Sequence, residues 1–372
     1  MSGSAGFHFE LSDFDNDRLS NWASRQPYLT IGRSPSGEVG AIGYTYTSNG
    51  QAENTVVLTA IVPIESSGKV QAKQFYYNKD DQLSSVGFLG GPDWTGKYTD
   101  VNPISITNFV FKKNLFTITS ASYPNATASP IYLHRTEPDL RSVQHTSSME
   151  YRKPYGADEQ RISVAAAAFT GNDKSERVFL FESLKPLETS PNGRLIVRES
   201  DPESDRDPQF LEEDSKELAT FKGTAFISAV SLSGKVHVII NATGDTGPMI
   251  LTYDGTWNTG KPVVIENSET LPASWCGTNL IAFQDKMYYM GYLSDQSAGA
   301  THEPKLMVLW CDPNHLEAGW KWAKDKDACY GYPSEPPLSA TYYPPAGTLA
   351  AYKDNSGRSK LSLFRPMYGG LG

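Results

Sequence analysis

The sequence predicts an all-β fold, a six-bladed β-propeller with about four strands per blade, over all 372 residues. Three observations support this prediction: a strand pattern that recurs six times, small-residue strands that precede it, and a composition suited to strands and turns. The chain has 20 Tyr, 16 Phe and 7 Trp, which favour strands, and 31 Gly and 24 Pro, which favour turns. Propellers often exceed the usual size of one domain, so we expect a single domain.

The recurring pattern is an apolar run that ends in an aromatic or charged residue and precedes a turn. Its copies read QFYYN, IYLHR, LIVRE, ILTYD, MVLWC and LSLFR and begin at Gln74, Ile131, Leu195, Ile250, Met307 and Leu361. Their start-to-start spacings are 57, 64, 55, 57 and 54 residues, so six copies fill the chain. Self-similarity at such a period is typical of propeller blades.

Strands rich in small residues precede these copies, and we expect them to line the propeller axis, where strands converge. They are Val39–Tyr44, Val164–Phe169, Phe226–Ser231 and Thr348–Tyr352, with weaker matches at Asn279–Phe283 and Ile104–Thr107. A further strand, such as Val236–Ile240 or Lys286–Met290, lies between the two patterns. The expected blades span residues 20–80, 81–145, 146–205, 218–267, 272–328 and 335–372. We expect Phe7–Leu11 to add a strand to the last blade and close the ring.

Charge and hydropathy exclude several classes of partner. The net charge is -9 and the basic residues do not cluster, which argues against nucleic acid as a partner. No apolar run approaches the roughly 20 residues that span a bilayer, so we expect no membrane insertion. The N-terminal residues lack the apolar core of a secretory signal, and the three cysteines have no CxxC spacing. The chain is therefore predicted to be cytoplasmic, with idle thiols, although one disulfide is left open.

Common catalytic and metal-binding signatures are absent from the sequence. It contains no GxSxG, HExxH or P-loop motif, and its six histidines have no metal-ligand spacing, so we predict no metal and no cofactor. The acidic segment of residues 199–217 lacks the turn glycine of a calcium loop. We interpret this segment as a solvated loop between blades. A hydrolase whose catalytic residues meet only in the fold is left open.

One blade resembles those of the fungal fucose-specific lectins. The resemblance is clearest over residues 224–260, where Leu251–Gly260 reads LTYDGTWNTG. It implies a six-bladed propeller with sugar pockets between blades. Each such pocket would take an Arg from the second strand of a blade, a Glu from the third strand and a Trp or Tyr from the following loop.

Carried over residue by residue, this lectin set is incomplete. In the fourth blade Trp257 matches, but His237 or a neighbour stands at the Arg position and Met249 stands near the Glu position. In the third blade Arg177 matches, but the stretch that begins at Gly193 offers no Glu. We therefore expect that no blade carries a complete set.

A divergent propeller of this length also resembles the hetero-Diels–Alderases of fungal tropolonic sesquiterpene pathways. This resemblance implies a cofactor-independent pericyclase that joins a tropolone quinone methide to a humulene-type sesquiterpene. Its partners would be small hydrophobic substrates. Such an enzyme works by holding two apolar reactants in reacting geometry and by donating hydrogen bonds to the developing charge.

Three loops that enter inner strands are expected to line one mouth of the propeller. They are residues 151–155, 274–277 and 341–345. We predict that Arg152, Lys153 and Tyr343 are catalytic. The predicted substrate-binding residues are Tyr151, Tyr155, Trp275, Tyr342 and Trp257. Two alternatives to the enzyme stay open, namely a fucose-type lectin with degenerate sites and a scaffold for protein partners. The sequence also leaves open whether the protein is a monomer or a homodimer.

Overall fold

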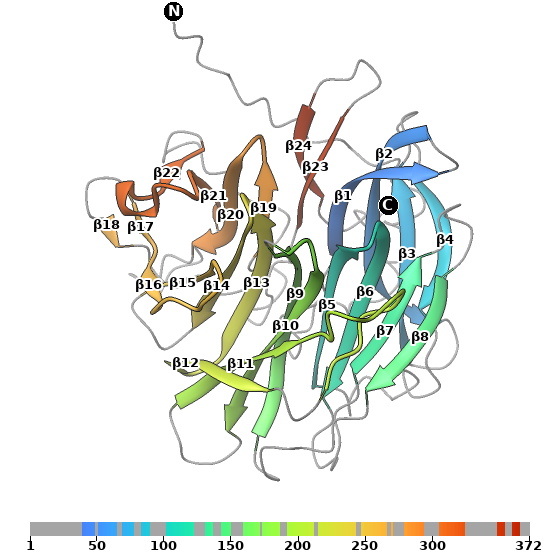
Figure 1. Cartoon of the computed structure of the whole chain (residues 1–372), viewed down its shortest axis with the longest axis horizontal. Helices are drawn as coiled ribbons and strands as arrows, with labels where there is room; N and C mark the ends of the chain where they lie inside the picture. The colour runs from blue at the N-terminus through green and yellow to red at the C-terminus, as the bar shows by residue number, and fades with distance from the viewer. Residues whose placement is uncertain are drawn as a thin grey trace, which may run out of the picture.

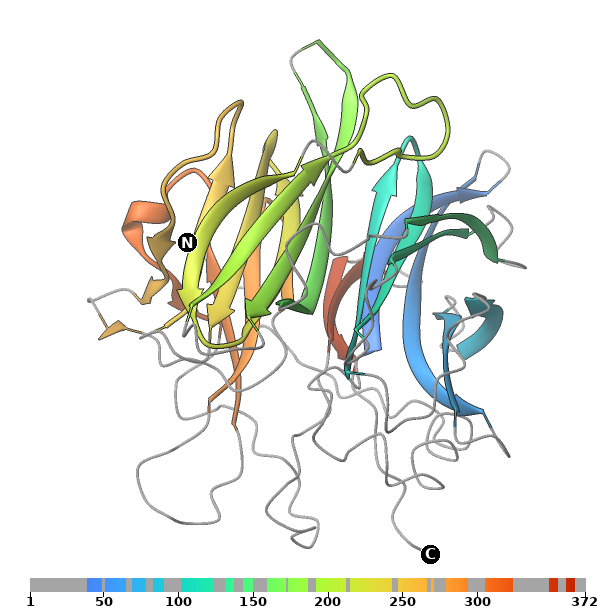
Figure 2. The same cartoon turned by 90° about the horizontal axis from the view of Figure 1, so that it is seen from below.

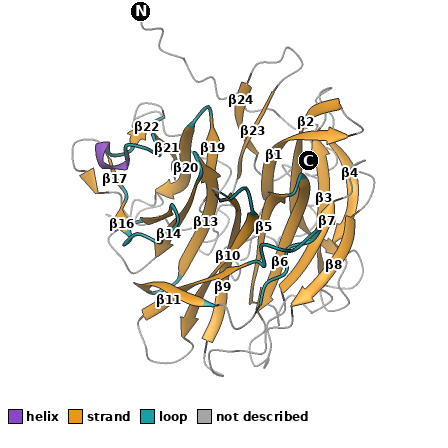
Figure 3. Cartoon of the chain, viewed as in Figure 1, coloured by secondary structure: helices purple, strands orange, loops and turns teal. Residues whose placement is uncertain are grey.

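We examined a computed structural model of the chain. It describes residues 39–48, 51–64, 69–77, 83–89, 102–122, 131–136, 143–149, 159–171, 173–186, 192–211, 215–242, 247–265, 269–270, 279–293, 305–323, 348–353 and 359–364. Within these residues the fold is all-β, and a 3-10 turn at Leu316–Ala318 is the sole helical segment (Figure 3). None of these residues belongs to a helix with the length and hydropathy needed to cross a bilayer.

The described strands form six main sheets in chain order, each a run of antiparallel neighbours. The first two sheets are β1 (Val39–Ser48), β2 (Gln51–Ile64), β3 (Lys69–Tyr77) and β4 (Leu83–Leu89), then β5 (Asn102–Phe111), β6 (Asn114–Ser122), β7 (Ile131–Thr136) and β8 (Val143–Met149). The third and fourth are β9 (Glu159–Thr170), β10 (Glu176–Pro186), β11 (Asn192–Glu199) and β12 (Lys216–Lys222), then β13 (Ala225–Leu232), β14 (Lys235–Ala242), β15 (Met249–Tyr253) and β16 (Lys261–Pro262). The last two are β19 (Asn279–Phe283), β20 (Lys286–Leu293), β21 (Lys305–Cys311) and β22 (Lys321–Trp322), then β23 (Thr348–Lys353) and β24 (Ser359–Phe364). A small pair, β17 (Val264–Ile265) and β18 (Glu269–Thr270), follows the fourth sheet.

The first strands of the six sheets close a ring, which confirms the six-bladed β-propeller. Going around it, β1, β5, β9, β13, β19 and β23 each contact the next, and β23 contacts β1. Figure 1 shows these strands around the centre, with β4, β8, β12 and β22 at the periphery. All six small-residue strands predicted from the sequence are these inner strands.

Side-chain hydroxyls link successive inner strands. The backbone N–H of Ala166 donates to Thr107 Oγ1 of the preceding blade at 3.2 Å. In the same way the N–H of Ile227 donates to Ser163 Oγ, and the N–H of Leu280 donates to Ser228 Oγ. Small residues are required here because the strands converge on the axis, and a hydroxyl on such a residue satisfies a backbone donor that would otherwise be buried.

The core lies between blades rather than within one layer. Successive residues of a strand point to opposite faces, so Phe179 and Phe181 of β10 pack toward the fourth blade while Val178 and Leu180 pack toward the second. The junction of the fourth and fifth blades buries Ile239, Tyr289 and Trp320 among other side chains. The third and fourth blades are therefore each held by apolar contact with both neighbours.

A buried ion triad ties the first three strands of the third blade together. Glu182 of β10 is fully buried and accepts hydrogen bonds from Arg161 Nε of β9 at 2.7 Å and Arg198 Nε of β11 at 2.8 Å. Burial alone would raise the pKa of Glu182, but the two guanidinium groups outweigh it and hold that pKa below the ordinary value. The carboxylate is ionised at neutral pH, and the triad is a structural group.

Three details of the predicted blades differ from the structure. β4 belongs to the first sheet but lies beyond the predicted boundary at residue 80, and β12 joins the third sheet beyond the predicted boundary at residue 205. The LSLFR copy in β24 pairs directly with the inner strand β23, so it holds the second position of its sheet and not the third. The predicted closing strand Phe7–Leu11 lies outside the described residues.

The acidic segment does not connect two blades. It connects β11 to β12 inside the third sheet, and part of it packs against the second blade. We call residues 200–211 the strap. In Figure 2 the strap runs, in yellow-green, toward the teal strands of the second sheet. The predicted placement between blades was wrong, whereas the predicted solvation holds for half of the strap, where the exposed residues are Pro202, Glu203, Asp205, Arg206, Gln209 and Leu211.

Candidate functional site

An ion pair stands at the end of the third blade, on the side that faces the fourth. Arg177 is the second residue of β10 and Glu199 is the last residue of β11. Arg177 Nη1 donates to Glu199 Oε1, and Nη2 donates to Ser175 Oγ at 3.3 Å. The side chains of Arg177 and Glu199 keep 25% and 37% of their surface exposed, so a ligand can reach them.

One donor of this ion pair has no partner within the described part of the chain. Arg177 Nε is buried and makes no hydrogen bond there. A guanidinium group presents five N–H donors in a fixed planar arrangement, and Glu199 and Ser175 occupy only part of it. The N–H groups of Nη1 and Nη2 that Glu199 and Ser175 leave over, rather than the buried Nε, are the donors for an oxygen-rich ligand.

Aromatic residues of the fourth blade form the wall beside this ion pair. Tyr253 ends β15, and Trp257 follows in the next loop with its ring centroid 5.1 Å from that of Tyr253. Trp257 also packs edge-on against Phe179 and Phe181 of the third blade, at 5.6 and 5.5 Å. Both Tyr253 and Trp257 are half-buried, so each ring offers part of its surface to solvent.

A tight turn holds Trp257 in place. Tyr253 and Trp257 pair as an isolated antiparallel bridge, and Thr252 N donates to Asn258 Oδ1 at 2.7 Å. Gly255 in this turn has φ 107°, a conformation that residues with a Cβ rarely adopt. The segment LTYDGTWNTG, which carries the lectin resemblance, thus builds the aromatic wall.

Burial and the nearby ion pair shift the pKa of the Tyr253 hydroxyl. Burial raises the pKa of Tyr253, Glu199 raises it further and Arg177 partly opposes this. The phenol therefore stays protonated at neutral pH and can act as a hydrogen-bond donor.

The third blade carries both charged residues of the lectin-type set, but its own following loop supplies no Trp or Tyr. Its second strand supplies Arg177, its third strand supplies Glu199, and the next blade supplies Tyr253 and Trp257. The sequence prediction placed the Glu position near Gly193, at the opposite end of β11. The missed signal was the recurring pattern itself, because LIVRE ends on Glu199.

Strand register locates the equivalent positions in other blades. Arg177 pairs with Phe169 of the inner strand, and the residue two further on, Phe179, pairs with Glu199. The same relation gives three further pairs, which are Asn114 with Arg135, Lys235 with Thr252 and Lys286 with Trp310. None of these pairs combines a cation with a carboxylate, so the described blades are chemically unequal.

Register also corrects the assignments made for the fourth blade. Lys235, rather than His237, stands at the Arg position, and Thr252 stands at the Glu position. Met249 pairs with Ile240 and packs toward the third blade, so it does not face the junction with the fifth blade.

Of the predicted site residues, the structure describes Trp257 alone, and Trp257 lines the candidate site. The other predicted residues lie outside the described ranges, and their roles stay predictions. They are Tyr151, Arg152, Lys153, Tyr155, Trp275, Tyr342 and Tyr343. The described residues contain no cluster of three or more His, Cys, Asp or Glu side chains suited to hold a metal ion. Cys311 is buried with a free thiol, and burial, together with Asp312, raises its pKa.

Comparison with known proteins shows similarity at the level of fold. No family model and no curated protein matches the chain. An α-L-arabinofuranosidase from Fusarium graminearum superposes with a TM-score of 0.54 at 12% identity, over 75% of this chain and 78% of that one. A Trypanosoma rangeli sialidase gives 0.50 at 9% identity, over 90% of this chain and 57% of that one. The fucose-specific lectin from Aleuria aurantia gives 0.48 at 9% identity, over 92% and 99%. Structural neighbours of this propeller thus include both glycosidases and a lectin.

Proposed function

We propose that this propeller binds a fucose-type saccharide at the junction of its third and fourth blades. The observation that carries the proposal is the half-exposed ion pair of Arg177 and Glu199 beside the rings of Tyr253 and Trp257. Neighbouring sugar hydroxyls both donate and accept hydrogen bonds, so a guanidinium and a carboxylate can share them. The apolar C–H face of the sugar ring then lies against the aromatic wall.

Binding is better supported than hydrolysis at this site. Glycoside hydrolysis generally uses two carboxyl groups on either side of the scissile bond, about 5–9.5 Å apart. Among the described residues of the site, Glu199 is the carboxylate in direct contact with Arg177. A carboxylate held in this way is suited to accept hydrogen bonds from a ligand.

The ring-forming reaction stays a prediction, and the described site supports it less well. An apolar substrate would cover Arg177 and Glu199 without replacing the water around them, and desolvating charged groups is costly. Its predicted catalytic residues Arg152, Lys153 and Tyr343 are not among those that the structure describes.

Isothermal titration calorimetry with L-fucose tests the proposal, with D-galactose and D-glucose as comparison sugars. We expect Arg177→Gln and Glu199→Gln each to weaken binding by roughly ten- to a hundred-fold, because hydrogen bonds to charged groups contribute about 1.5–3 kcal/mol. Trp257→Ala is expected to weaken binding in the same direction by removing the wall.

Arg194→Gln is the matched control. Arg194 lies on β11, pairs with Glu159 and Glu217, and is 27% exposed, close to the 25% of Arg177. It lies at the opposite end of the strand from Glu199, so we expect sugar binding to be unchanged. Equal losses in Arg194→Gln and Arg177→Gln would contradict the site, and failure of the unmodified protein to bind any of the three sugars would overturn the proposal.

A further inference from the structure

The strap leaves the third sheet directly after the proposed ligand residue Glu199. Ser200 N donates to Val178 O, and Val178 N donates to Ser200 Oγ, both at 2.8 Å. Ser200 also pairs with Phe210 as an antiparallel bridge, and Asp201 N donates to Gln209 O. The base of the strap is therefore fixed to β10 immediately beyond the ion pair.

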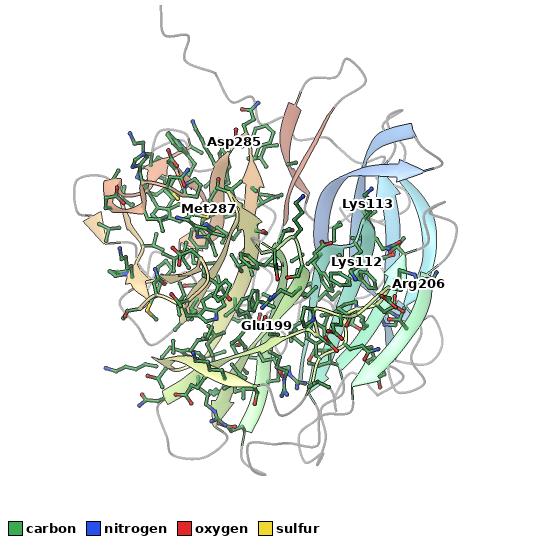
Figure 4. All side chains as sticks on the ribbon, viewed as in Figure 1. Lys112, Lys113, Glu199, Arg206, Asp285 and Met287 are labelled. Carbon is green, nitrogen blue, oxygen red and sulfur yellow. The ribbon has the colours of Figure 1, made fainter. Side chains whose placement is uncertain are left out.

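The body of the strap is anchored on the second blade. Asp207 forms an ion pair with Arg135 of β7, and Lys112 Nζ donates to the carbonyl oxygen of Ser204. Phe210 packs against the buried cluster between the second and third blades. Figure 4 labels Lys112 on the second sheet and Arg206 in the part of the strap that reaches that sheet. An ionic, a polar and an apolar contact thus hold one short segment.

The strap covers a position equivalent to the proposed sugar site. Arg135 holds the same place in the strand register of the second blade that Glu199 holds in the third. The bridge from Ser200 to Phe210 repeats the bridge from Tyr253 to Trp257, one blade earlier.

The two junctions differ in the length of the segment between the bridged residues. Residues 254–256 make a short turn after Tyr253, and Glu199 beneath it keeps 37% exposure. Residues 201–209 make a longer segment after Ser200, and Arg135 beneath it is only 3% exposed. The longer segment brings the Asp207 carboxylate into an ion pair with Arg135, the side chain that an incoming ligand would otherwise contact.

We propose that the strap is a built-in occupant of the second inter-blade position and a positioning device for Glu199. It keeps ligand from the junction of the second and third blades, and its anchorage on Arg135 keeps the end of β11 in register with Arg177. The positioning role rests on the proposed function, whereas the occupancy of the second position does not.

Hydrogen exchange and sugar titration of Asp207→Asn separate these two roles. We expect amide exchange in residues 200–211 to rise by about ten-fold or more, because loss of the ion pair lets the strap open locally. Exchange at the amides of Glu199 and Ser200 is expected to rise with it, and the affinity for L-fucose is expected to fall by roughly three- to ten-fold. Asp207→Glu, which retains the charge, should restore both readouts in large part.

Asp205→Asn is the control, since Asp205 lies in the strap with the same charge and is exposed. It should change neither exchange nor affinity. Unchanged exchange in Asp207→Asn would overturn the occupant role. Faster exchange of the strap with unchanged exchange at Glu199 and unchanged affinity would overturn the positioning role. If the unmodified protein does not bind L-fucose, the proposed function fails and the positioning role with it, whereas exchange still decides the occupant role.

Discussion

His237 shows how one buried side chain sets a pH dependence. It is fully buried on β14, and its Nδ1 lies 3.0 Å from Thr252 Oγ1, while Nε2 has no partner among the described residues. Burial lowers the pKa of His237 from 6.5 to about 4, and the charge of Lys235 adds to this. The folded protein therefore keeps the imidazole neutral where an unfolded chain would take up a proton.

The free energy of unfolding should fall as the pH drops from about 6.5 to about 4, because only the unfolded state binds the proton there. The difference between the two pKa values, 6.5 less about 4, corresponds to about 3 kcal/mol. His237→Asn should remove this part of the pH dependence in urea unfolding at pH 4.5, 6 and 7.5. His315→Asn is the control, because His315 is exposed. An unchanged pH slope in His237→Asn would contradict the assignment.

At the scale of the strand, β9 shows why inner strands need small residues. Residues 165–168 are all alanine, and Ala165 and Ala167 pack toward the fourth blade while Ala166 packs toward the second. The alanine run thus has close neighbours on both faces of the strand, and a larger side chain at these positions would have to displace them.

Ala167→Leu should therefore overpack the junction of the third and fourth blades. We expect it to lower the free energy of unfolding by about 1–3 kcal/mol in urea titrations. Thr170→Leu on the exposed end of the same strand should change stability by no more than about 0.5 kcal/mol. Equal effects of the two substitutions would show that the alanine run is not a packing requirement.

At the scale of the whole molecule, the sixth sheet closes the ring. β23 contacts both β1 and β19, and its Leu349 is fully buried in the cluster that joins the fifth and sixth blades. Loss of a contact at this point should destabilise the strands on both sides of β23, which are β1 and β19. A closed ring has no free end at which one blade could move without affecting its neighbours.

Leu349→Ala is expected to cost about 2–5 kcal/mol of stability through the cavity it creates. Hydrogen exchange should accelerate in β1 as well as in β19. Leu211→Ala, at a leucine that is 45% exposed, should have little effect on either measure. Faster exchange in β19 alone would mean that the destabilisation caused by Leu349→Ala does not extend through β23 to β1.

Periodic features of the chain were predicted well from the sequence. All six inner strands were placed correctly, because alternation and residue size are local properties that can be read directly from the sequence. Trp257 and Arg177, which line the proposed sugar site, were each singled out from a short stretch of chain. The direct pairing of β24 with the inner strand β23 was not predicted. Strand order depends on which strands form hydrogen bonds with each other in the folded protein.

The sequence by itself determined the repeat, the strands and the aromatic turn around Trp257. Only the tertiary structure decided that Glu199 meets Arg177 and that Asp207 reaches Arg135 of another blade. The physical reason is that the first pair depends on the register of β10 and β11, whereas the second depends on the approach of two blades. Arg135 and Asp207 are 72 residues apart, a separation that carries no periodic signal. Local pattern thus specifies the blades, whereas contact between blades specifies the site.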